Sequence, residues 1–234
     1  METRCVSIGT LNELLKKLRG SPLAARAVPF LIFASFTFFQ GKLGEESKYW
    51  LYAIKSIVGV FLIWAVRPSI PELRWTISLE AVAIGVLVIV FWIALDPFYP
   101  KLSMGIPERP WNPNADFGNG SPMAWFFIVT RILGATLVVP PLEEMFYRSF
   151  VYRYIIDPNF EQIPLRRFHP VSLLVTSCVF GLSHREWLAG ILCGFAYQWL
   201  VLRRGHLGDA MTAHAISNLL LGAWVVYKGG WQFW

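Results

Sequence analysis

Apolar residues recur in long runs along the whole chain of 234 residues, and short polar segments separate these runs. A run of about 17–25 apolar residues is long enough to cross a bilayer as a helix. The pattern predicts helices at 24–39, 49–66, 76–95, 123–156, 170–186, 188–202 and 209–228. We therefore expect an all-α, polytopic transmembrane helical bundle with seven spans, and eight spans as the alternative.

The number of spans depends on the run 123–156. As one straight helix it would extend about 50 Å, whereas the hydrocarbon core of a bilayer is about 30 Å thick. Pro140 and Pro141 must break or kink it, because proline cannot donate the helical hydrogen bond. A single crossing there puts these basic residues on one side: Lys16, Lys17, Arg19, Arg67, Arg74, Arg166, Arg167, Arg203 and Arg204. Basic residues favour the cytoplasmic side, so seven crossings with a cytoplasmic N-terminus are preferred over eight.

The first 20 residues contain no continuous apolar stretch. Leu11, Leu14 and Leu18 follow helical spacing, with Lys16 and Lys17 beside them. This pattern predicts an amphipathic segment on the membrane surface at 1–20, with an unstructured tail as the alternative. Residues 21–234 are expected to form a single integral-membrane domain.

Composition supports a membrane protein. The chain is 55% hydrophobic and 15% charged, whereas soluble domains carry about 25% charged residues. The net charge is +6, but the basic residues cluster between apolar segments, so the lipid bilayer is the expected partner and nucleic acid is not. The three cysteines form no CxxC pair, which argues against a cysteine-based zinc site.

Charged residues interrupt the apolar pattern at PPLEEMFYRSF, residues 140–150. A charge at the centre of a bilayer costs about 2.5–3.5 kcal/mol, so Glu143, Glu144 and Arg148 need a reason to be there. Glu144 and Arg148 are four residues apart and can form an ion pair on one helical face. Glu143 points elsewhere and stays free, as a general base requires. Alternatively, both glutamates cap a helix near the interface.

Two further segments place polar side chains within apolar helices. VFGLSH puts Phe180 and His184 four residues apart, and HAISN does the same for His214 and Asn218. Each pair lies on one helical face, and polar residues within spans usually face the interior of the bundle. We therefore expect Glu143, His184, His214 and Asn218 to meet in one site.

The three motifs together resemble a known family. Glu-Glu-x-x-x-Arg at 143–148, Phe-x-x-x-His at 180–184 and His-x-x-x-Asn at 214–218 occur in this order. The set resembles the CAAX-protease and bacteriocin-processing (CPBP) family of intramembrane glutamic endopeptidases, which includes the Rce1-type enzymes. The resemblance covers a protease-like core at about 123–222. Ser149 is a departure, because the family often carries Gly after the Arg. The aromatic-rich N-terminal spans resemble the exosortase-associated bacterial subgroup.

This resemblance implies hydrolysis of a peptide bond within the membrane. Glu143 would activate water, His184 would hold that water, and His214 with Asn218 would bind the oxyanion. Glu144, Arg148 and Phe180 would support them. The expected substrate is a membrane-anchored or membrane-spanning protein or peptide, no cofactor is expected, and the expected location is a bacterial inner membrane.

Two rival interpretations remain open at this point. His184, His214 and Glu143 could ligate zinc in an intramembrane metalloprotease, although the chain has no HExxH motif. Buried Glu, His and Arg residues also build proton relays, so a non-catalytic transporter or scaffold is the second rival.

Two more charged residues lie in predicted spans, Glu80 and Arg131, and we expect them to pair within the bundle.

Overall fold

The computed structural model describes residues 8–102 and 110–234, and within these ranges the chain is helical and contains no named strand. The predicted all-α class is thereby confirmed. The α-helices are α1 Ile8–Gly20, α2 Pro22–Phe39, α3 Ser47–Val66, α4 Leu79–Leu95, α5 Pro113–Phe117, α6 Pro122–Leu133, α7 Val139–Glu144, α8 Tyr152–Ile156, α9 Pro170–Leu182, α10 Trp187–Arg204 and α11 Gly208–Lys228.

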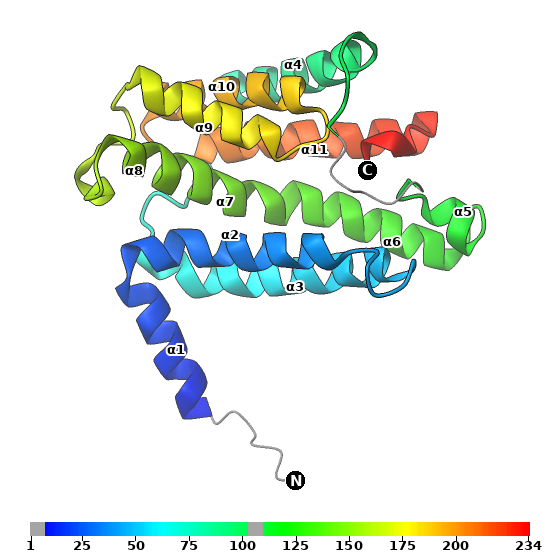
Figure 1. Cartoon of the computed structure of the whole chain (residues 1–234), viewed down its shortest axis with the longest axis horizontal. Coiled ribbons are helices and arrows are strands. Elements are labelled where there is room, and N and C mark those ends of the chain that lie inside the picture. The colour runs from blue at the N-terminus through cyan, green and yellow to red at the C-terminus, as the bar shows by residue number, and fades with distance from the viewer. Residues whose placement is uncertain (1–7, 103–109) are drawn as a thin grey trace.

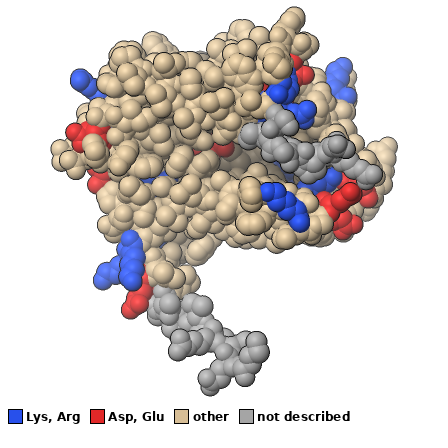
Figure 2. Space-filling view, viewed as in Figure 1, with Lys and Arg blue, Asp and Glu red and all other residues tan. Residues whose placement is uncertain are grey.

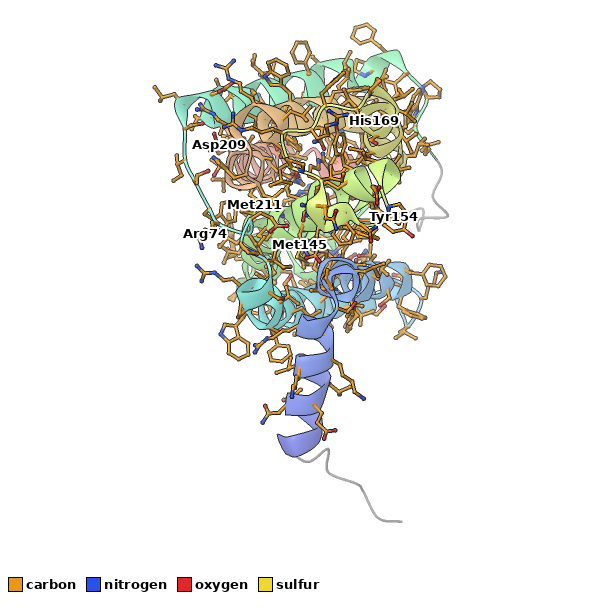
Figure 3. All side chains as sticks on the ribbon, turned by 90° about the vertical axis from the view of Figure 1, so that its left-hand side faces the viewer. Arg74, Met145, Tyr154, His169, Asp209 and Met211 are labelled. Carbon is orange, nitrogen blue, oxygen red and sulfur yellow. The ribbon has the colours of Figure 1, made fainter. Side chains whose placement is uncertain are left out.

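The bundle has two layers with one long helical run between them (Figure 1). Helices α2 and α3 pack together in one layer, and α4, α9, α10 and α11 form the other. The run from α6 to α8 lies between the layers and contacts both. Figure 3 shows Met145 and Met211 near the middle of the molecule, and both are fully buried. Helix α1 leaves the bundle at an angle (Figure 1).

In the part of the chain that the structure describes, five helical segments are long and apolar enough to cross a membrane: 22–39, 47–69, 79–98, 122–156 and 208–228. The predicted seven or eight spans are therefore not confirmed. Helix α9 has 13 residues, which corresponds to about 20 Å and falls short of a bilayer core of about 30 Å. Helix α10 ends in Arg203 and Arg204 and is not one of the five.

The run 122–156 is continuous, although Pro140 and Pro141 lie in its middle. Two π-helical stretches, Gly134–Val138 and Met145–Val151, flank α7. The prolines occupy the first turn of α7, where a helix tolerates the loss of their N–H groups. The predicted break is thus absorbed by a π-helical turn just before the prolines, and the chain does not reverse direction there.

The basic residues predicted to share one side of the membrane lie at one end of the bundle. The end of α1, the α3–α4 connection, the segment between α8 and α9 and the end of α10 meet there (Figure 1), and Figure 3 views the molecule from this end. Arg19 Nε donates to the carbonyl of Ala65 at 2.6 Å, and Arg166 Nη2 donates to the carbonyl of Arg204 at 2.9 Å. The common location of these segments agrees with the charge pattern.

The predicted pair between Glu80 and Arg131 is wrong. Glu80 lies in the first turn of α4, at the basic end, where it pairs with Arg203 at 3.1 Å and Arg204 at 2.8 Å. Arg131 lies in the last turn of α6, and α6 begins at the opposite end of the bundle (Figure 1). The apolar pattern does not show how far along the bundle each charge lies, and these two charges lie at different depths.

Small residues let α9 and α10 approach closely, as the Gly190 and Gly194 spacing suggests. A Cβ atom at Gly190 would lie 2.8 Å from the Cα of Gly181, and one at Gly194 would lie 2.8 Å from the Cα of Ser177. Both contacts involve backbone, which cannot move aside cheaply. The hairpin that carries His184 at its tip therefore depends on these glycines.

We expect Gly190→Leu to destabilise the protein, because the added side chain must push α9 and α10 apart. Overpacking of this kind costs about 1–3 kcal/mol, or about 2–10 °C in melting temperature. Thermal unfolding of the purified protein in detergent measures the change. Gly20→Leu is the matched control, because a Cβ at Gly20 meets no atom within 4 Å. A similar melting temperature for both variants would contradict the prediction.

Candidate active site

Glu144 is the centre of a buried polar chain. Its side chain is 0% exposed, and its Oε2 lies 3.1 Å from Nε of Arg148, as the four-residue spacing predicts. Its Oε1 lies 2.9 Å from Nδ1 of His214 on α11. An ionised carboxylate only accepts hydrogen bonds, so Nδ1 of His214 carries the hydrogen and donates it to Glu144. Glu144 therefore fixes the tautomer and the orientation of His214.

Arg148 is also held by aromatic rings. Its side chain is 1% exposed, and the guanidinium carbon lies 4.4 Å from the ring centre of Phe180. Among the described residues, no group accepts a hydrogen bond from its Nη1 or Nη2. The ion pair with Glu144 and the face of Phe180 thus carry the charge of this arginine, which gives Phe180 a supporting place in the site.

Glu143 points away from this chain and keeps a free oxygen. Its side chain is 15% exposed, and its Oε2 lies 3.9 Å from Nε2 of His214, too far for a direct hydrogen bond. Within the described part of the chain, this buried oxygen has no hydrogen-bond partner. His214 therefore lies between two glutamates, bonded to Glu144 through one ring nitrogen and facing Glu143 with the other.

His184 lies just beyond the end of α9 and is oriented by its own helix. Its Nδ1 lies 2.7 Å from the carbonyl oxygen of Phe180, which can only accept, so Nδ1 carries a hydrogen. In the neutral ring, Nε2 can then accept a hydrogen bond from a water molecule. The charge of Glu143 acts on His184, as does that of His214, so the three groups share one electrostatic environment. The ring of Phe180 lies 4.8 Å from His184 and 6.0 Å from His214, between centroids.

Asn218 has a partner that the sequence did not suggest. Its Nδ2 donates to the carbonyl of Ala135 at 2.8 Å. In the π-helical turn, the N–H of Val139 bonds to Gly134, and the next possible donor is Pro140, which has no N–H. Asn218 satisfies the carbonyl that the proline leaves free. A primary amide has two N–H groups, so one hydrogen of Asn218 remains for another acceptor.

Sequence reasoning missed the aromatic residues that position the two histidines. Tyr197 on α10 stacks on His214 with centroids 5.0 Å apart, and its hydroxyl lies 2.7 Å from Oγ of Ser217. Trp92 on α4 meets His184 edge-on at 5.7 Å. Neither aromatic belongs to a polar motif, and the chain has many similar residues, so only the packing of α4 and α10 identifies them.

A second buried network holds the helical run that carries the glutamates. Glu72, in the α3–α4 connection, pairs with Arg26 at 2.8 Å and Arg153 at 3.0 Å. The hydroxyl of Ser149 donates to the same carboxylate at 2.5 Å. Burial alone would raise the pKa of Glu72, but the charge of Arg26 and the hydrogen bond from Ser149 hold this pKa below its ordinary value. This network ties the N-terminal half to the helix of Glu143.

The space-filling view shows a hollow in one face of the molecule, with an acidic side chain visible at its floor (Figure 2). It lies between α9 and the run through α7. A separate pocket of about 450 Å³ is lined by residues of the segments 110–116 and 229–232, and none of the predicted site residues lines it.

The structure brings Glu143, Glu144, Arg148 and both histidines into one cluster, and it places Asn218 one turn beyond His214 on α11. Across residues 8–102 and 110–234, no group of three or more His, Cys, Asp or Glu side chains has an arrangement that could hold a metal ion.

Comparison with known protein families gives one match. Residues 124–220 match the family described as Type II CAAX prenyl endopeptidase Rce1-like, which confirms the resemblance seen in the motifs. The comparisons with curated proteins and with solved structures gave no match. This segment of the chain is therefore similar to that family, and the apolar helices support an integral-membrane protein.

We expect Glu144→Gln and Glu143→Gln to differ sharply in stability. Glu144→Gln removes the only carboxylate that pairs with Arg148 among the described residues, and it leaves that charge buried. Breaking a buried pair costs about 3–5 kcal/mol. Glu143→Gln removes no ion pair to an arginine or lysine, so its effect should stay within about 1 kcal/mol. Unfolding in detergent, followed by circular dichroism, compares them, and equal losses would show that the two glutamates are not specialised.

Proposed function

We propose that the protein is an intramembrane endopeptidase of the glutamic type, in which Glu143 activates a water molecule for attack on a peptide bond. The observation that carries this proposal is the unpartnered oxygen of Glu143 beside His214, whose orientation is fixed by Glu144. A free carboxylate next to a fixed imidazole, at a hollow in an apolar bundle, suits the abstraction of a proton from water. The Rce1-like match supports an endopeptidase.

In the proposed reaction, Glu143 takes one proton from water, and the resulting hydroxide attacks the carbonyl carbon of the substrate. The acceptor nitrogen Nε2 of His184 helps to hold the water. The tetrahedral intermediate collapses when its C–N bond breaks, and the proton held by Glu143 passes to the leaving amine directly or through His184. The products are a carboxylic acid and an amine, so atoms and charge balance.

The oxyanion needs donors, and the geometry restricts how His214 can supply one. Its Nδ1 hydrogen is already bonded to Glu144, so His214 donates from Nε2 only as an imidazolium. Asn218 can add the hydrogen that Ala135 does not use. Fixed donors in a water-poor site stabilise a developing oxyanion well, because they need no reorganisation during the reaction.

The proposed substrate is a membrane-anchored or membrane-spanning protein or peptide. We propose a location in a bacterial inner membrane. The grouping of basic segments at one end of the bundle supports an N-terminus in the cytoplasm. The hollow between α7 and α9 would admit the substrate from the side or from the cytoplasmic face.

The direct test is cleavage of a library of membrane peptides by the purified protein in detergent. We expect Glu143→Gln to lower the rate by at least about 10²–10⁴-fold, since this is what a general base contributes. Mass spectrometry of the products measures the loss. Glu13→Gln on the exposed face of α1 is the control and should cleave like the wild type. Equal product from Glu143→Gln and wild type would remove Glu143 from the mechanism.

Chelators test our proposal that no metal takes part. Treatment with EDTA or 1,10-phenanthroline should leave the cleavage rate of the wild-type protein unchanged, because a carboxylate base needs no metal. A zinc enzyme with His184, His214 and Glu143 as ligands would instead lose activity and regain it when zinc is added. That second outcome would replace the glutamic mechanism with the metalloprotease one.

A further inference from the structure

Arg131 is a cation that has no carboxylate partner among the described residues. Its guanidinium lies over three aromatic rings, with the guanidinium carbon 4.5 Å from the ring centre of Trp111, 5.1 Å from Tyr52 and 5.3 Å from Trp234. Within residues 8–102 and 110–234, no carboxylate pairs with this guanidinium, and the guanidinium donates no hydrogen bond. Basic side chains elsewhere in the bundle have oxygen partners: Arg26 and Arg153 at Glu72, Arg148 at Glu144, Lys48 at Asp116, and Lys55 at Thr37 and Gln40.

The aromatic rings stabilise this charge only in part. A cation over a ring gains about 0.5–2 kcal/mol, less than a hydrogen-bonded ion pair can give in a poorly hydrated place. The five N–H groups of an arginine form a planar fork that matches a carboxylate. Arg131 is half-buried, and no oxygen of the described residues occupies this fork.

Arg131 and Glu143 lie on the same face of their helical run. They are 12 residues apart, which in a regular α-helix would place them about 120° apart around the axis. The π-helical stretch Gly134–Val138 takes up one extra residue in its turn, so the difference falls to about 20°. The π-helical turn thus aligns the two side chains.

Helix α3 supports this alignment independently. Tyr52 donates from its hydroxyl to the carbonyl of Arg131 at 3.1 Å, and the charges of both Arg131 and Glu143 act on Tyr52. Both charges also act on Lys55, one turn further along α3. Arg131 and Glu143 therefore both lie within electrostatic range of the same turn of α3.

We propose that Arg131 is a specificity-determining residue that binds a carboxylate of the peptide substrate. The two residues are separated by about 18 Å along the helix axis. An extended peptide covers about 3.3 Å per residue, so the carboxylate would lie within about five residues of the scissile bond. It belongs either to an acidic side chain or to the C-terminus of the substrate. This inference rests on the proposed peptidase function and adds a substrate class to it.

The test compares matched peptides from the cleaved members of the library. One pair differs in a free C-terminal carboxylate against a carboxamide, and the other in Glu against Gln within five residues of the cleavage site. The wild type should prefer the carboxylate form in one pair by roughly 10–100-fold in kcat/KM, as expected for a hydrogen-bonded charge. Arg131→Gln should abolish this preference by raising KM for the carboxylate peptide, and Arg131→Lys should restore part of it.

Lys228→Gln is the matched control, because it removes a positive charge from an exposed residue at the end of α11, outside the ring cluster around Arg131. This variant should keep the full preference. A preference that is the same in wild type and Arg131→Gln, or absent from the wild type, would overturn the inference.

Binding separates this inference from the proposed function. Peptide affinity is measured by fluorescence anisotropy on the Glu143→Gln variant, with and without Arg131→Gln, so the readout needs no hydrolysis. Cleavage without carboxylate discrimination would overturn the role of Arg131 alone. Carboxylate-dependent binding that Arg131→Gln abolishes, together with equal cleavage by the wild type and Glu143→Gln, would support Arg131 and contradict the proposed peptidase mechanism. Melting temperatures of all variants show whether each protein is folded.

Discussion

The site depends on one buried carboxylate, that of Glu144, which has two partners on different helices. It neutralises Arg148 on its own helical run and holds Nδ1 of His214 on α11. Taking a charge out of water is expensive unless it is paired and hydrogen-bonded, and Glu144 meets both conditions. Because Glu144 neutralises the charge of Arg148 and orients His214, the neighbouring Glu143 can stay without a strong partner. The two adjacent glutamates point about 100° apart and have different environments. Glu144 is paired and buried, whereas Glu143, the proposed base, keeps a free oxygen.

The second constraint is the proline pair that precedes the glutamates. Prolines lack the backbone N–H group, and the helix here contains a π-helical turn before them rather than a break. This turn leaves the carbonyl of Ala135 free for Asn218, and it changes the register between Arg131 and Glu143. A local backbone feature thus determines both where α11 attaches and which side chains share a face with the proposed base.

The motifs predicted much of the site, and their limits have physical causes. The Glu144–Arg148 pair followed from four-residue spacing, which is a property of one helix and needs no tertiary information. The bond between Glu144 and His214 joins two helices, so no spacing rule predicts it. The predicted Glu80–Arg131 pair was wrong for the same reason. Apolar runs predict which segments are helical, but they do not predict how far along the bundle axis each charged residue lies. Helix lengths were also overestimated at α9, whose run 170–186 ends in a turn after Leu182.

Ser149 shows how the half of the chain without motifs supports the other half. Its hydroxyl donates to Glu72 at 2.5 Å and accepts from Arg26 and Arg153 at 2.8 Å each. Glycine at this position, common in the resembling family, would leave those three charged groups without their central hydroxyl. The serine therefore belongs with Glu72 and Arg26, which lie outside the Rce1-like segment 124–220. Ser149 departs from the family motif, but in this fold it has a structural role. Through its hydroxyl, α2 and the α3–α4 connection hold the helix of Glu143 in place.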